Sequence, residues 1–199
     1  MKKTNAICLM AALVAALAWG TAAFGADIRV VRGEGVAESL AEGVVQTLAE
    51  NANIEASMVP GPAREEGEEV AAYALRAGGG EGVSLVVVDW PEEEIGGKAW
   101  VEEGVAFLNV ALLGDEGTPA QTLSARANRE ALRAYAHLMG VPPCPFPLCV
   151  LTHCGSVDAL DEMSRSYCPP CWERLRLAAA ERGFNVLPVS MKANENQED

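Results

Sequence analysis

Cysteine placement constrains the fold of this chain more than any other feature of its sequence. Apart from Cys8, every cysteine falls within 28 positions, at Cys144, Cys149, Cys154, Cys168 and Cys171. Residues 27–143 contain none. Disulfides that staple a whole small domain are spread along it, whereas a local metal site or a stapled loop concentrates its cysteines. Most of the fold must therefore rest on an ordinary hydrophobic core, with one C-terminal stretch held by cysteines.

The cysteines form two close pairs, with four residues between Cys144 and Cys149 and two between Cys168 and Cys171. A tetrahedral thiolate site needs this arrangement, because each pair supplies two ligands from one turn, and four thiolates suit zinc better than magnesium or calcium. Two alternatives stay open. Disulfides would suit an oxidising compartment and leave Cys154 unpaired. A redox dithiol at 168–171 is disfavoured, because a thioredoxin-like fold needs more chain after that motif than remains here.

The N-terminus has the pattern of a secretory signal peptide. Lys2 and Lys3 precede an uncharged apolar run over 6–19 and small residues over 20–26. The run of about 14 apolar residues is shorter than the roughly 20 that span a bilayer. The sequence predicts a signal peptide over 1–25, cleavage within 23–26 and an exported protein, periplasmic or secreted, with no membrane association beyond the export signal.

Charge and histidine content exclude several functions. The formal net charge of −13 repels phosphate backbones and anionic headgroups, so no nucleic-acid partner is expected. His137 and His153 are the two histidines, which excludes any mechanism that needs three imidazoles.

Strand and helix patterns alternate over 27–140, and one more helix is predicted after the Cys-rich stretch. Strands are predicted over 27–32, 54–59, 85–88 and 104–113, and helices over 36–50, 65–76, from 122 or 124 to 139, and 172–182. Gly140 is placed to end the third helix. The fold class is therefore α/β, with α+β character: a twisted mixed sheet with helices over 27–140, a Cys-rich C-terminal part over 141–191, and a disordered tail over 192–199.

The stretch 129–144, together with the cysteines after it, resembles the archaemetzincins, a family of zinc-dependent metallopeptidases. Their pattern is H-E-x-x-H-x-x-G-x-x-H-C-x4-C-x-M, followed by C-x-x-C. His137, Gly140 and the four paired cysteines keep this spacing, and the resemblance is specific over 129–177. It implies a zincin-like fold with one structural zinc per chain on Cys144, Cys149, Cys168 and Cys171.

The same resemblance shows which catalytic positions differ. Arg133 stands where the family has its first histidine ligand, Ala134 replaces the general base, Pro143 replaces the third histidine, and Leu151 replaces the methionine. Of the family's three histidine ligands, this sequence keeps only His137, as a vestigial ligand. A catalytic zinc needs about three protein ligands and an open water position. The loop residue His153 could add a second imidazole but no general base.

We therefore predict an exported archaemetzincin-like pseudopeptidase that acts in binding or regulation, and no catalytic residues. The alternatives are an active zinc-dependent metallopeptidase with non-standard ligands, and a disulfide-stapled exported structural domain. Arg133 is either solvated or paired with a carboxylate, or it forms with His137 a pocket for the carboxylate of a peptide or protein ligand. The sequence does not indicate an oligomeric state.

Overall fold

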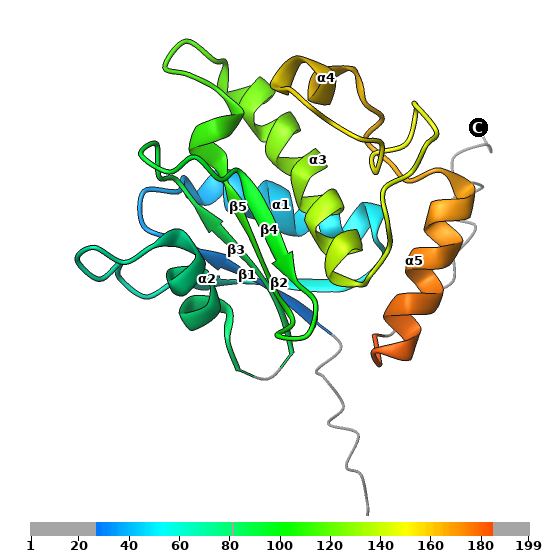
Figure 1. The fold of residues 1–199 in the computed structure, drawn as a ribbon, viewed down its shortest axis with the longest axis horizontal. Helices are drawn as coiled ribbons and strands as arrows, with labels where there is room; N and C mark the ends of the chain where they lie inside the picture. The colour runs from blue at the N-terminus through cyan, green and yellow to red at the C-terminus, as the bar shows by residue number, and fades with distance from the viewer. Residues whose placement is uncertain (1–26, 81, 185–199) are drawn as a thin grey trace, which may run out of the picture.

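The computed structural model describes residues 27–80 and 82–184 (Figure 1). The predicted signal peptide with its cleavage region, the predicted tail over 192–199 and the last residues of the 141–191 part lie outside the described residues. Among the residues described, no helix is both long and apolar enough to cross a membrane.

A five-stranded sheet forms the centre of the molecule, in the order β2-β1-β3-β5-β4. Its strands are β1 (Asp27–Arg32), β2 (Glu55–Pro60), β3 (Val83–Val88), β4 (Gly97–Trp100) and β5 (Val105–Asn109). Four strands run parallel, and β4 pairs antiparallel with β5 at one edge. All six residues of β3 are buried, as expected for a central strand covered on both faces. The predicted mixed sheet is confirmed.

Helices cover both faces of this sheet (Figure 1). On one face lie α1 (Glu38–Asn51) and α3 (Ala120–Leu138), and α5 (Pro169–Glu181) stands to the side of them (Figure 1). Apolar side chains of all three helices share a core with Val30 and Leu85. On the other face, α2 (Val70–Gly78) packs on Val31 and Val86. The alternation of side chains along each strand supplies both cores.

Four segments differ from the sequence prediction. The second helix starts at Val70, because Gly67, at φ 74°, turns the chain after Glu66. The predicted strand over 104–113 ends at Asn109, whose Oδ1 accepts hydrogen bonds from the N–H groups of Trp90 (3.0 Å) and Ala111 (3.3 Å) and starts the short 3₁₀ helix η1 (Val110–Leu113). Neither β4 nor the short helix α4 (Val157–Glu162) was predicted.

Two helices, α3 and α5, begin earlier than predicted, each at or next to a proline. The first residue of α3, Ala120, follows Pro119, and α5 begins at Pro169. Proline is well suited to the start of a helix, because the first N–H groups have no intrahelical partner. Gly140, at φ 80°, adopts the left-handed conformation just beyond the end of α3, as predicted. This turn directs the chain from α3 into the Cys-rich loop.

Candidate functional site

The four paired cysteines come from two segments that are distant in sequence. Cys144 and Cys149 lie in the loop after α3, while Cys168 caps α5 and Cys171 lies in its first turn. The N–H of Cys144 donates to the carbonyl of Leu151 (2.9 Å), which folds the loop back on itself. The N–H of Cys168 points at the sulfur of Cys149 (3.4 Å), which places the start of α5 against this loop.

The four sulfur atoms form one compact buried group. All Sγ atoms lie within 4.8 Å of one another, and Cys144 and Cys168 are 3.7 Å apart. A tetrahedral site with Zn–S bonds of about 2.3 Å separates its sulfurs by about 3.8 Å. Backbone N–H groups of Phe146 and Leu151 point at the sulfurs of Cys144 (3.4 Å) and Cys149 (3.5 Å). The group could hold one metal ion, and its donor set fits zinc.

The thiols of this group differ in how readily they ionise. Burial raises the pKa of Cys149 and that of Cys171, so these thiols resist ionisation by themselves. Burial also acts on Cys168, but hydrogen bonds from the Cys171 N–H and from the neighbouring thiols outweigh it and lower the pKa of Cys168. A divalent ion would stabilise all four as thiolates, because metal binding displaces their protons.

The fifth cysteine and the second histidine stand apart from this group. Cys154 is half-buried and its Sγ lies 3.1 Å from the carbonyl of Ser156, while His153 is exposed. Over 27–80 and 82–184, the four-cysteine group is the only set of three or more histidine, cysteine or acidic side chains placed to hold a metal. All five described cysteines are free thiols.

The motif helix α3 carries Arg133, which connects two parts of the molecule. Its Nε lies 2.9 Å from the Oε1 of Glu130, one turn earlier. Its Nη1 donates to the carbonyls of Val150 (3.0 Å) and Thr152 (2.5 Å) in the Cys-rich loop. Burial raises the pKa of Glu130, and the charge of Arg133 opposes that shift. The guanidinium thus ties α3 to the loop that presents Cys149.

His137 lies one turn beyond Arg133. Its Nδ1 is 3.0 Å from the carbonyl of Val141, which favours the tautomer with a proton on Nδ1 and leaves Nε2 as an acceptor. Leu151, at the methionine position of the family, is fully buried in the core. Pro143, at the position of the third histidine, is exposed.

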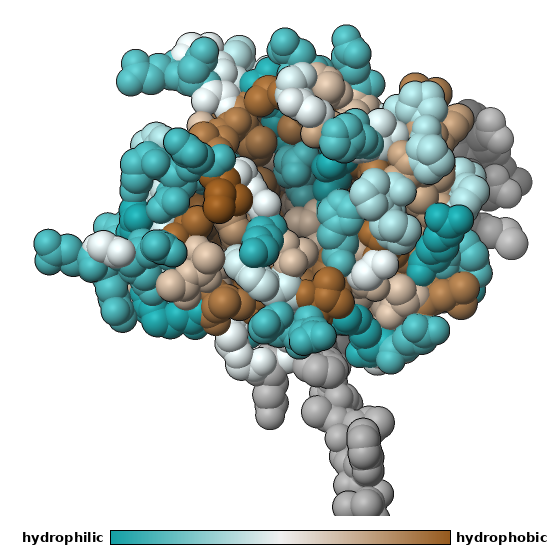
Figure 2. Space-filling model, in the orientation of Figure 1, coloured by the Kyte–Doolittle hydropathy of each residue, from teal (hydrophilic) through white to brown (hydrophobic). Residues whose placement is uncertain are grey.

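A pocket of about 290 Å³ opens between β4 and α3. Figure 2 shows this face of the molecule, hollowed between the two elements. Arg133, Ala134 and His137 line it together, as their spacing on one helix requires, but Pro143 does not. The sequence analysis missed Lys98 on β4 and Glu130 as lining residues. The ion pair between Glu130 and Arg133 could have been predicted, because the two residues lie three positions apart on one helix.

These features define a class of protein: a mixed α/β domain whose long helix leads into a four-cysteine group that could hold one metal ion. Solved structures with a similar fold match the chain. Archaemetzincin from Methanopyrus kandleri has a TM-score of 0.64 and 19% identity, over 78% of this chain and 97% of that one. Archaemetzincin from Archaeoglobus fulgidus, complexed with malonate, has a TM-score of 0.61 and 21% identity, over 74% of this chain and 99% of that one.

A zinc-dependent peptidase from Methanocorpusculum labreanum also matches, with a TM-score of 0.57 and 18% identity, over 74% of this chain and 99% of that one. No protein-family model and no curated protein sequence matches the chain. The chain therefore has the archaemetzincin fold, which confirms the predicted resemblance at the level of structure.

Proposed function

We propose that this chain is a non-catalytic binding or regulatory protein built on the archaemetzincin fold, with one structural zinc on its four paired cysteines. The observation that carries the proposal is the lining of the pocket between β4 and α3. There, an Arg133–Glu130 ion pair, the methyl group of Ala134 and one imidazole take the place of a metal-binding set. A permanently protonated guanidinium repels a metal ion, and alanine offers no general base.

We further propose that the pocket takes a peptide or protein ligand through Arg133 and His137. The Nε and Nη1 atoms of Arg133 are engaged by Glu130 and two loop carbonyls, so Nη2 keeps two N–H donors for a ligand carboxylate. The Nε2 of His137 supplies an acceptor in the same pocket. Arg133→Ala should lower the affinity for a panel of peptides, while Arg174→Ala, at an exposed arginine on α5, should not. Unchanged binding across the panel would remove Arg133 from the ligand site.

Metal stoichiometry separates the proposal from its alternatives. We expect one zinc per chain in the purified protein, none in Cys168→Ser, and one in His137→Ala. Two zinc ions in the wild type and one in His137→Ala would instead support a second, catalytic metal. No zinc, together with fewer than five free thiols in the denatured protein after the signal peptide is removed, would support the disulfide-stapled domain.

Hydrolysis assays test inactivity directly. We expect the wild type to cleave a mixed peptide library no faster than His137→Ala does, with or without added zinc. Cleavage that a chelator abolishes and that His137→Ala lacks would establish an active metallopeptidase with unusual ligands.

Export is a separate proposal, supported by Lys2, Lys3 and the apolar run after them. Expression of the full-length chain should yield a mature protein in the exported fraction whose N-terminus lies at residues 24–27. A cell-associated protein that keeps Met1 or its apolar run would contradict export.

A further inference from the structure

A second cavity lies on another face of α3, between that helix and α1. It has a volume of about 340 Å³, and we call it the α1–α3 groove, lined by Thr47 and Asn51 from α1, by residues of α3 from Gln121 to Leu132, and by Arg165. Seven of its nine lining side chains are polar. None of the nine lines the pocket between β4 and α3, so the two cavities are separate.

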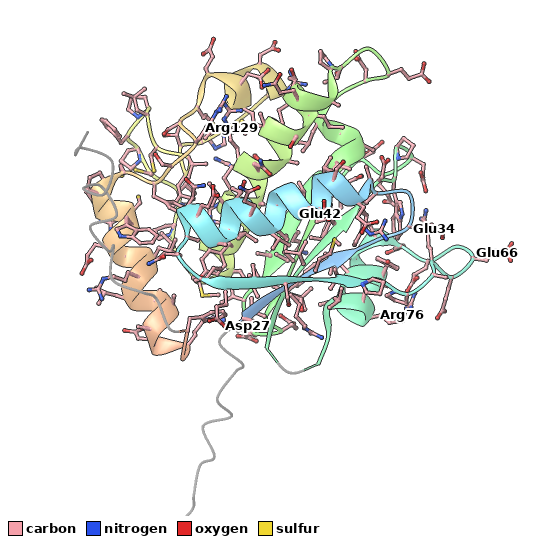
Figure 3. All side chains as sticks on the ribbon, turned by 180° about the vertical axis from the view of Figure 1, so that it is seen from behind. Asp27, Glu34, Glu42, Glu66, Arg76 and Arg129 are labelled. Carbon is pink, nitrogen blue, oxygen red and sulfur yellow. The ribbon has the colours of Figure 1, made fainter. Side chains whose placement is uncertain are left out.

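Two arginines give the α1–α3 groove a positive charge. Arg129 is 7% exposed and donates to the backbone carbonyls of Met163 (3.2 Å), Asp161 (3.2 Å) and Ala125 (3.4 Å), with no carboxylate among these partners. Figure 3 shows Arg129 beside α3, above α1. Burial lowers the pKa of Arg129, and the charge of nearby Arg165 lowers it further.

The acidic groups around the groove do not neutralise these charges by direct contact. The carboxylate of Asp161 is held by Arg126, at 2.6 and 2.9 Å. Arg165 is exposed, and no carboxylate in the described part of the chain lies within ion-pair distance of it. No acidic side chain lines the groove. In a chain of net charge −13, two guanidinium groups facing one polar cavity without an acidic partner are unusual.

We propose that the α1–α3 groove binds a small polar molecule that carries an oxyanion, either a carboxylate or a phosphate. Guanidinium groups bind both anions through paired N–H donors. Three of the five donors of Arg129 are used by the carbonyls, and those of Arg165 are open to a ligand. The Gln121 amide and the Ser124 hydroxyl offer hydrogen bonds to the rest of the molecule. The volume lies near the lower end of the range for ligand pockets, which selects a small ligand.

Titration with inorganic phosphate and with succinate tests this proposal, in parallel isothermal calorimetry and NMR experiments on the purified protein at low ionic strength. Arg165→Gln removes an exposed guanidinium, and Gln121→Glu adds a carboxylate at an exposed position, so both variants should fold. Arg174→Gln is the matched control, because it makes the same change in net charge at an exposed site outside the groove.

We expect the wild type and Arg174→Gln to bind at least one of the two anions with equal affinity, and Arg165→Gln and Gln121→Glu to bind it at least about tenfold more weakly. The side-chain amide resonances of Gln121, Asn128 and Asn51 should shift during the titration. Preference for phosphate or for succinate identifies the ligand class. Equal weakening in all three variants, no binding of either anion by the wild type, or shifts confined to other residues would overturn the proposal.

Discussion

Arg133 connects helix α3 with the Cys-rich loop. Its guanidinium bonds two carbonyls of the Cys-rich loop and pairs with Glu130, whose pKa is raised by burial. We expect Arg133→Met to lower the free energy of unfolding by about 3 kcal/mol, because it removes these bonds and leaves a half-buried carboxylate unpaired.

Glu130→Gln provides the control for this prediction. Glutamine can still accept a hydrogen bond from Arg133, so this variant should lose only about 1 kcal/mol. In the double variant the two effects should not add, because the residues share one interaction. Urea denaturation at neutral pH measures all three. A loss below 1 kcal/mol in Arg133→Met would show that the contacts to the loop contribute little.

Cys168 is the residue at which the metal-site prediction can be tested most sharply. It caps α5 and lies 3.7 Å from Cys144, so Cys168→Ser should abolish tight zinc binding. Because binding energy at a structural site is folding energy, we expect a loss of about 4 kcal/mol, at the upper end for a single substitution. Cys154→Ser, at the thiol outside the group, should change stability little. Equal melting temperatures for the two variants would argue against a ligand role for Cys168.

At the scale of elements, the turn before α2 depends on Glu68. Arg76 donates two hydrogen bonds to its carboxylate, at 2.7 and 2.6 Å, and the N–H of Glu65 donates a third, at 3.1 Å. Chiefly because of the bonds from Arg76, the pKa of Glu68 falls from its ordinary value of 4.5 to about 2. A carboxylate with a lowered pKa contributes stability above its unfolded pKa and loses it as the pH falls through the folded one.

The stability difference between the wild type and Glu68→Gln should therefore be largest above pH 4.5 and shrink steadily toward pH 2. Chemical denaturation at a series of pH values gives this difference directly, and comparing the two proteins at each pH cancels acid effects on the metal site. Glu66→Gln, at an exposed neighbour, should match the wild type throughout. A difference that grows on acidification would contradict the assigned role of Glu68.

Elements whose own residues form a clear helical or strand pattern could be predicted from the sequence. Elements that form through contacts with distant segments could not. The apolar run of β3 and the repeat along α1 are local, and both elements lie where the sequence indicates. In contrast, β4 contains Gly97 and Lys98 and is a strand only because its backbone pairs with β5. Helix α4 does have a local cap, in which Ser156 accepts a hydrogen bond from the Ala159 N–H at 3.1 Å, but its six residues are too few to show a helical repeat.

The same distinction holds for the candidate site. The spacing of the cysteines was enough to predict one four-sulfur group, and the helical spacing of Arg133 and His137 was enough to place both in one pocket. The sequence could not show that Lys98 from β4 completes that pocket or that Arg129 and Arg165 meet beside α1. Those arrangements depend on how helices and strands pack, which no local pattern encodes.

At the scale of the whole molecule, the metal site and the sheet share one core. The buried cysteines and Leu175 of α5 belong to the same apolar cluster as Ile28 and Leu85 of the sheet. The Cys-rich part is therefore packed as a continuation of the α/β part, and loss of the metal should weaken the whole domain. We expect a chelator to lower the melting temperature as a single transition, by roughly 8–16 °C for a loss of about 4 kcal/mol in a domain of this size.

Differential scanning calorimetry with and without chelator checks this expectation, and Cys168→Ser provides its control. The chelator should leave the transition of that variant in place, because the variant has no tight site from which metal can be removed. Amide hydrogen exchange should show that protection of β3 and of α5 falls together when the metal is stripped, since both belong to one apolar cluster. Two separate transitions, of which only the smaller responds to the chelator, would show instead that the Cys-rich part unfolds independently of the sheet.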